Sequence, residues 1–153
     1  MAQLAAGDDA PDFEAQDAEG KTWRLSELRG QKVILFFYPA DDTPGCTKEA
    51  CDFRDAHAEL NDAGYVVLGA SPQGAKSHSA FSSKYGLNFP LLVDKDMSLA
   101  KAYGAAGIFG AFENIPLLVK RSTFVIDENG KISQALYGVK ARSHVADLQA
   151  SLG

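Results

Sequence analysis

The sequence predicts an α/β fold in which helices flank a mixed central β-sheet. Two continuous apolar runs, "KVILFFY" at 32–38 and "YVVLGAS" at 65–71, have the composition of strands buried on both faces. A helical stretch lies between them, and strands joined by a helix pair in parallel. Farther along, Asn129-Gly130 separates two more strand-like runs and predicts a hairpin, whose antiparallel strands would make the sheet mixed.

The first half of the chain adds two further elements to these strands. Residues 12–25 contain two short strand-like runs around a turn at Ala18-Glu19-Gly20, which predicts an N-terminal β-hairpin. A helix is expected from Pro44 to Ala63, because Gly64 is the type of residue at which helices end. This helix would connect the two apolar strands.

The second half of the chain continues the alternation of strands and helices. Residues 75–86 read as a helix, with Ala80, Phe81 and Tyr85 expected on its inward face. The remaining expected elements are a strand at 90–94, a helix at 97–104, strands at 122–127 and 131–138, and a C-terminal helix at 143–152. This order is the thioredoxin-like arrangement, preceded by a hairpin.

The length and charge of the chain limit the possible classes. One domain covering 1–153 is expected, and 153 residues suffice to bury a core. The net charge of −5 argues against nucleic acid or an anionic membrane as the main partner. No window approaches the ~20 apolar residues of a membrane span. The start, "MAQLAAGDDAPDF", lacks the features of a secretory signal, which predicts a cytoplasmic protein.

The only two cysteines lie in the stretch "YPADDTPGCTKEAC" at 38–51, where the first apolar strand gives way to its helix. Cytoplasmic thiols stay reduced, which favours a catalytic or metal-binding role for this pair over a structural one. We expect Thr43 to be the N-cap, Pro44 the first helical residue and Cys46 the third. There, unpaired backbone amides and the helix dipole would stabilise a Cys46 thiolate.

The spacing of the cysteines predicts different roles for the two sulfurs. On an ideal helix, five residues separate two Cα atoms by ~8.6 Å, whereas a disulfide needs about 4.4–6.8 Å. A stripe at 46, 50, 53, 57 and 60 shares one helix face, and Cys51 lies off it. Cys46 and Cys51 therefore cannot bond while the helix is intact. The spacing favours an attacking thiolate and a resolving thiol that is reached after local unfolding.

The segment "YPADDTPGCTKEACDFRD" closely resembles the active site of peroxiredoxins of the Q type, the bacterioferritin comigratory protein subfamily. The resemblance extends over nearly the whole chain, including "GDDAPDFEAQDAEGKTWRLSELRGQKVILFFYP" and "KRSTFVIDENGKI". Its specific core is the pattern Pro-x-x-x-Thr-x-x-Cys, formed here by Pro39, Thr43 and Cys46. A second cysteine five residues later, Cys51, narrows the match to the subfamily.

The resemblance implies a thiol peroxidase that reduces hydrogen peroxide and organic hydroperoxides with no metal, haem or other cofactor. It implies a peroxidatic Cys46, a resolving Cys51, an intramolecular Cys46–Cys51 disulfide, and Arg121 as the remaining active-site residue. Reduction by thioredoxin or a similar dithiol and a monomeric state are also implied.

The chemistry suits these residue types. Arg121, the Thr43 hydroxyl and the Cys46 amide would stabilise charge on the leaving oxygen as fixed donors. Pro39 would shape the turn and shield the sulfenic acid, which condenses with the Cys51 thiol. A dithiol would then restore both thiols through a mixed disulfide.

Other classes of protein remain open at this point. A thioredoxin-like disulfide oxidoreductase typically uses Cys-x-x-Cys, and a zinc module needs a different ligand spacing. A non-catalytic thioredoxin-fold interaction protein is compatible with the fold alone.

Several charged residues also have purely structural interpretations. Arg121 could be a solvated charge at a strand end. Glu49 is expected at the surface, with orientation of Arg121 as a lesser alternative. We expect His57 at the core boundary, and His78 and His144 at the surface. The apolar segment 105–122 is either a loop packed on its own domain, an apolar rim favouring bulky hydroperoxides, or a partner surface.

Overall fold

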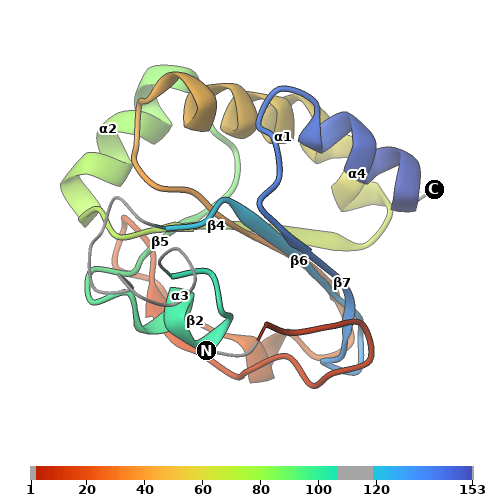
Figure 1. Cartoon of the computed structure of the whole chain (residues 1–153). Coiled ribbons are helices and arrows are strands. Elements are labelled where there is room, and N and C mark those ends of the chain that lie inside the picture. Colours follow the sequence, from red (N-terminus) through yellow and green to blue (C-terminus); the bar gives the residue numbers. More distant parts are fainter. Residues whose placement is uncertain (1–2, 107–118, 153) are drawn as a thin grey trace.

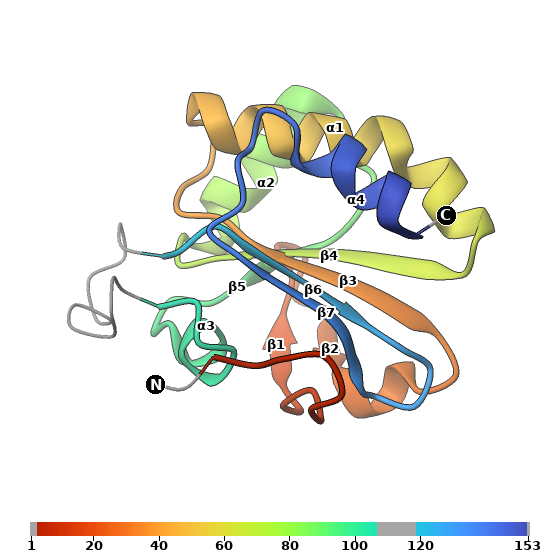
Figure 2. The same cartoon turned by 45° about the vertical axis from the view of Figure 1, so that its right-hand side comes forward.

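The computed structural model describes residues 3–106 and 119–152. Its centre is a sheet of five strands: β3 (Lys32–Phe37), β4 (Tyr65–Ser71), β5 (Leu91–Val93), β6 (Ser122–Ile126) and β7 (Ile132–Tyr137). The helices are α1 (Pro44–Asp62), α2 (Ala75–Tyr85), α3 (Ser98–Ala102) and α4 (His144–Leu152). Helices α1, α2 and α4 cover one face of the sheet, while α3 lies on the other (Figure 1, Figure 2).

Strand β3 is the central strand of the sheet, whose order is β5-β4-β3-β6-β7. It pairs in parallel with β4, to which α1 connects it, and antiparallel with β6. Strands β6 and β7 form the antiparallel hairpin expected from Asn129-Gly130, and Gly130 has a φ of 78° in its turn. The mixed α/β sheet predicted from the sequence is therefore confirmed.

The alternation of side chains along β3 divides the core into two layers. Val33, Leu35 and Phe37 join the apolar cluster on the α3 side of the sheet. Ile34 and Phe36 point to the opposite side, into the cluster beneath α1. Both sets are almost completely buried, which explains why this strand reads as an unbroken apolar run.

The N-terminal hairpin is formed by β1 (Glu14–Gln16) and β2 (Thr22–Arg24), which pair antiparallel as predicted. Asp17 builds its turn: Oδ1 accepts hydrogen bonds from the amides of Glu19 and Lys21, and Oδ2 accepts one from the Trp23 indole. A short 3-10 helix, η1 (Leu25–Leu28), follows strand β2 and buries Leu25. The hairpin lies on the side of the sheet away from α1 (Figure 2).

Helix α1 attaches to the sheet along one face, as its apolar stripe predicts. Its buried residues are Cys46, Glu49, Ala50, Phe53, Ala56 and Leu60. The Phe53 ring stacks on Phe36 of β3, with ring centroids 4.5 Å apart. His57 is half-buried, in agreement with a boundary position. No helix within residues 3–106 or 119–152 is long and apolar enough to cross a membrane.

The inward faces of α2 and α4 differ from the sequence-based expectation at three positions. On α2, Phe81 is buried and Tyr85 partly buried, but Ala80 is exposed and His78 is buried in its place. His144 of α4 is also buried. The surface assignment of His78 and His144 was wrong because each ring has a polar partner inside the fold.

Candidate active site

Cys46 lies in the first turn of α1, which a short loop at 38–43 connects to the carboxyl end of β3. Thr43 is the N-cap residue, with φ −93° and ψ 154°, and Pro44 begins the helix, as predicted. The amides of this first turn have no carbonyl to bond within the helix, and the positive end of the helix dipole points toward them. Cys46 is only 1% exposed. Its sulfur is therefore held where a negative charge is stabilised.

Arg121 contacts the Cys46 sulfur directly. Its Nη2 donates a hydrogen bond to Cys46 Sγ at 3.2 Å. This contact follows from the sheet, because β6 runs antiparallel to β3 with Phe37 opposite Ser122. The residue before β6 therefore comes beside the end of β3, where α1 begins. The interpretation of Arg121 as a solvated strand-end charge is wrong: its side chain is 17% exposed and bonded to the site.

Glu49 is the second partner of this guanidinium. Its Oε1 accepts a hydrogen bond from Arg121 Nη1 at 2.9 Å. Glu49 follows Cys46 by three residues, so both side chains lie on the same helix face. The expected surface position of Glu49 is wrong, because the residue is 0% exposed. Orientation of Arg121 was the lesser alternative at the sequence level, and the contact supports it.

Burial and the charge of Arg121 have opposite effects on the pKa of Glu49. Burial raises the pKa of Glu49 to about 7, although the positive charge of Arg121 opposes this rise. Among the described residues, its second oxygen, Oε2, has no hydrogen-bond partner. The Arg121 guanidinium thus donates one hydrogen bond to the Cys46 sulfur and another to the Glu49 carboxyl group.

Gly45 makes the approach of Arg121 possible. A Cβ atom built on Gly45 would lie 3.1 Å from Arg121 Nη2, closer than an ordinary van der Waals contact. A larger residue would therefore push the guanidinium away from the Cys46 sulfur. The sequence offered no signal for this role beyond the glycine itself.

Thr43 ends the loop before α1 but does not cap the helix with its side chain. The structure gives no capping hydrogen bond from this hydroxyl; Oγ1 instead donates to the Ala40 carbonyl at 2.9 Å. With its proton used in this way, the hydroxyl presents lone pairs outward and can accept a hydrogen bond. Pro39 is half-buried at the start of the same loop.

Cys51 is a free thiol and half-buried, and Cys46 is also free. Both cysteines belong to the continuous helix α1, in agreement with the helix expected from Pro44 to Ala63. Of the apolar segment 105–122, residues 107–118 lie outside the described residues. Its two ends are joined by an antiparallel bridge between Ala106 and Val119.

Comparison with known proteins identifies the family of this chain. The AhpC/TSA family profile matches residues 6–135. Peroxiredoxin Bcp of Bacillus subtilis is 40% identical over 144 residues, which cover 94% of this chain and 92% of that protein.

Two solved structures add to this match. Peroxidoxin BcpB of Mycobacterium tuberculosis has 35% identity and a TM-score of 0.86, over 98% of this chain and 97% of that one. The bacterioferritin comigratory protein of Xanthomonas campestris has alkyl peroxide reduction activity. It has 33% identity and a TM-score of 0.84, over 92% of this chain and 89% of that one. The chain therefore belongs to the AhpC/TSA family and, within it, to the peroxiredoxins of the Q or bacterioferritin comigratory type.

Proposed function

We propose that this peroxiredoxin reduces hydroperoxides through the Cys46 thiolate. The contact that carries the proposal is the hydrogen bond from Arg121 Nη2 to Cys46 Sγ, 3.2 Å long, at the positive end of α1. A buried sulfur with a guanidinium donor is arranged to be an anion, and the thiolate is the nucleophilic form of cysteine.

The first step is attack of the Cys46 thiolate on one peroxide oxygen. A sulfur–oxygen bond forms, the oxygen–oxygen bond breaks, and its electron pair leaves with the second oxygen. The peroxide proton passes to that leaving oxygen, so the products are the Cys46 sulfenate and an alcohol, or water when the substrate is hydrogen peroxide. Arg121 stays charged throughout and faces the reacting atoms.

Thr43 and the first-turn amides would orient the peroxide. Since the Thr43 hydroxyl donates to Ala40, it can accept the hydrogen bond of the peroxide O–H. The Cys46 amide can donate to the oxygen on which charge develops. This assignment changes the donor role expected for Thr43 into an acceptor role. Pro39, at the start of the loop, would shield the sulfenic acid from water.

In the second step, Cys51 resolves the sulfenic acid. The Cys46 sulfenate takes up a proton from solvent, the Cys51 thiol then attacks the Cys46 sulfur, and a disulfide forms as the sulfur–oxygen bond breaks and water leaves. Both residues lie within α1, so its first turns must unwind before the sulfurs meet. A thioredoxin-like dithiol would then reduce the Cys46–Cys51 disulfide by thiol exchange.

We further propose alkyl hydroperoxides as substrates beside hydrogen peroxide, since the Xanthomonas campestris protein has alkyl peroxide reduction activity. An internal resolving cysteine removes the need for a second subunit, so we expect a monomer that acts as one domain over 1–153. A cytoplasmic location fits a chemistry that needs reduced thiols.

Peptide mapping after a single oxidation tests this proposal. Reduced protein receives one equivalent of peroxide, and thiols are counted before digestion under non-reducing conditions. We expect the loss of two thiols, an intrachain link between Cys46 and Cys51, and a monomer on a non-reducing gel. Protein that consumes no peroxide, or that links its cysteines only between chains, would contradict the proposal.

A further inference from the structure

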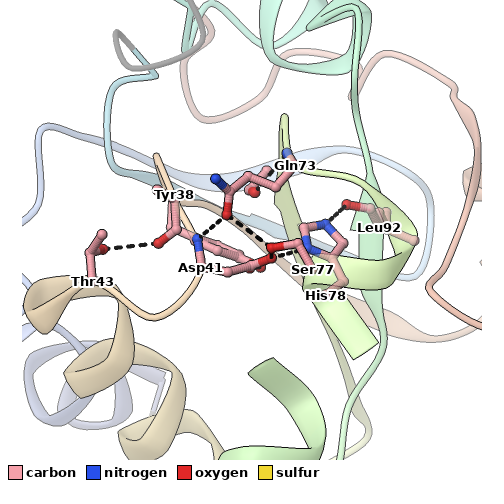
Figure 3. A network of polar contacts seen from close by, with 9 residues as sticks. Tyr38, Asp41, Thr43, Gln73, Ser77, His78 and Leu92 are labelled. Atoms are coloured by element: carbon pink, nitrogen blue, oxygen red, sulfur yellow. Dashed lines mark hydrogen bonds and ion pairs between the residues drawn. The ribbon is translucent and has the colours of Figure 1, made fainter. Parts of the chain in front are cut away.

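Helix α2 holds the loop from Pro39 to Thr43 in place through hydrogen bonds. Two neighbouring carboxylates in the loop, Asp41 and Asp42, both point to this helix and accept hydrogen bonds from it. Figure 3 shows the Asp41 part of this contact, beside the Thr43 hydroxyl. The loop is short and leads directly into the first turn of α1, so its position determines where this turn places Cys46.

Asp41 is the centre of the buried part of this network (Figure 3). Its side chain is only 3% exposed. Oδ1 accepts a hydrogen bond from the Tyr38 hydroxyl at 2.6 Å, and Oδ2 accepts one from the Ser77 hydroxyl at 2.7 Å. The Asp41 amide donates to Gln73 Oε1 at 2.6 Å. Both the side chain and the backbone of this residue are therefore fixed.

The His78 ring is a further buried partner of this carboxylate. The ring is 0% exposed, and its Nδ1 lies 2.7 Å from Asp41 Oδ2. Its Nε2 lies 2.8 Å from the Leu92 carbonyl oxygen, which can only accept a hydrogen bond. Nε2 must therefore carry a proton, whichever form the rest of the ring takes.

The carboxyl group of Asp41 is stabilised as an anion. Burial raises the pKa of Asp41, but hydrogen bonds from His78, Tyr38 and Ser77 outweigh it and hold the pKa below its usual value. The His78 ring thus joins the loop to β5 inside the fold, through Asp41 at Nδ1 and the Leu92 carbonyl at Nε2.

The exposed part of the loop is held by the same helix. Asp42 adopts a φ of 58°, a left-handed conformation that is uncommon outside glycine. Its carboxylate accepts hydrogen bonds from the Tyr85 hydroxyl at 2.7 Å and from Lys84 Nζ at 2.8 Å. Helix α2 thus fixes two consecutive residues just before the N-cap of α1.

We propose that His78 is a positioning residue for the peroxide reaction: its buried ring fixes Asp41, and through Asp41 the loop that places Thr43 and the first turn of α1 around Cys46. This inference rests on the proposed peroxidase function. His78 touches neither the sulfur nor the substrate. It acts by keeping the acceptor and donor groups of the loop in the geometry that peroxide attack requires.

The test measures two reactions of Cys46 in a Cys51→Ser background, in which only the first step occurs. Sulfenic acid formation with hydrogen peroxide depends on the placement of Thr43 and the amides, whereas alkylation by iodoacetamide needs only the thiolate. In His78→Gln we expect the peroxide rate constant to fall about 10- to 100-fold, the size expected for slight misplacement of reacting groups. Alkylation should change less than about threefold, because Arg121 and the helix end remain.

Leu148→Ala is the matched control. Leu148 is buried on α4, in the same core layer, and its apolar side chain takes no part in the hydrogen bonds of the loop, so its truncation lowers stability without removing a member of the network. We expect its peroxide rate constant to equal that of the parent. An equal loss in Leu148→Ala and His78→Gln, or an equal loss of both reactions in His78→Gln, would overturn the positioning role.

Two further measurements keep the inference falsifiable if His78→Gln does not fold. Asp41→Asn retains the size of the side chain and should show the same selective loss of the peroxide reaction. The double variant Asp41→Asn/His78→Gln, where it folds, should react with peroxide no more slowly than the slower single variant. Nitrogen NMR of the unsubstituted protein should find a proton on Nε2 of His78, where the Leu92 carbonyl accepts a hydrogen bond. A His78 ring without a proton on Nε2, additive losses, or an Asp41→Asn rate equal to the parent would refute the inference. A Cys51→Ser protein that is inert to peroxide would instead refute the peroxidase function along with it.

Discussion

The buried carboxyl group beside Arg121 predicts a pH-dependent stability that one substitution should remove. Glu49 is 0% exposed, and its pKa is raised from 4.5 to about 7 by burial, against the opposing charge of Arg121. Glu49→Gln keeps the size of the side chain and an oxygen that can accept from Arg121, but it cannot ionise. The variant and the wild type should therefore respond differently to pH.

The sign follows from proton binding. A carboxyl group with a raised pKa holds its proton more tightly in the folded state than in the unfolded state. Between pH 4.5 and about 7 the wild type therefore loses stability as pH rises, and above this range the loss is complete. The full change in pKa corresponds to about 3 kcal/mol, of which roughly 2 kcal/mol falls between pH 5 and pH 8. The free energy of unfolding of Glu49→Gln should not decrease in this way.

Urea unfolding of the reduced proteins at pH 5 and pH 8 measures the effect. The free energy of unfolding of Glu49→Gln, relative to the wild type, should increase by about 2 kcal/mol between the two pH values. Glu59→Gln, an exposed site on the same helix, is the control and should show almost no such increase. A difference between Glu49→Gln and the wild type that does not vary with pH would refute the raised pKa.

Three further substitutions test the site. Arg121→Lys keeps the charge but loses the planar fork that contacts both Cys46 and Glu49, so the peroxide rate constant in stopped flow should fall about 100-fold; a rate equal to the wild type would show that charge alone suffices. In Gly45→Ala the new Cβ would lie 3.1 Å from Arg121 Nη2, and we expect about a 10-fold slower peroxide reaction with a nearly unchanged melting temperature; a large drop in melting temperature would point to a folding role instead. Cys51→Ser should react with the first equivalent of peroxide at the normal rate but fail to turn over with thioredoxin, and mass spectrometry should find Cys46 sulfinic acid accumulating; normal turnover would disprove the resolving role.

The sequence predicted most of the architecture because the signals involved are local. Apolar runs, Gly64 after α1 and the Asn-Gly turn each depend on a few adjacent residues, and the strands, helices and sheet they predicted are present. The position of Cys46 in the first helical turn was predictable for the same reason. Arg121 came only from the resemblance to a family, since nothing local marks a strand-end arginine as a sulfur partner.

The errors concern polar side chains with distant partners. Glu49 bonds a residue 72 positions away, and His78 bonds one 37 positions away. A polar residue on a helix is assigned to the surface unless its partner is known, and the partner is set by the assembled sheet. Thr43 shows the same limit at short range, because its hydroxyl donates to the Ala40 carbonyl and makes no capping hydrogen bond with the first-turn amides.

The order of buried residues along α1 also sets a limit on how far the helix can open. Before Phe53, the side chains it buries are Cys46, Glu49 and Ala50, which are small or polar. Phe53 is the first large apolar one, stacked on Phe36, and exposing such a ring costs roughly 2–3 kcal/mol. The part of α1 that carries both thiols thus buries little apolar surface against the sheet, and the first large apolar contact comes two residues later. We expect melting to stop at this aromatic anchor, so that each redox cycle disturbs only the tip of the helix and leaves the sheet and its packing undisturbed.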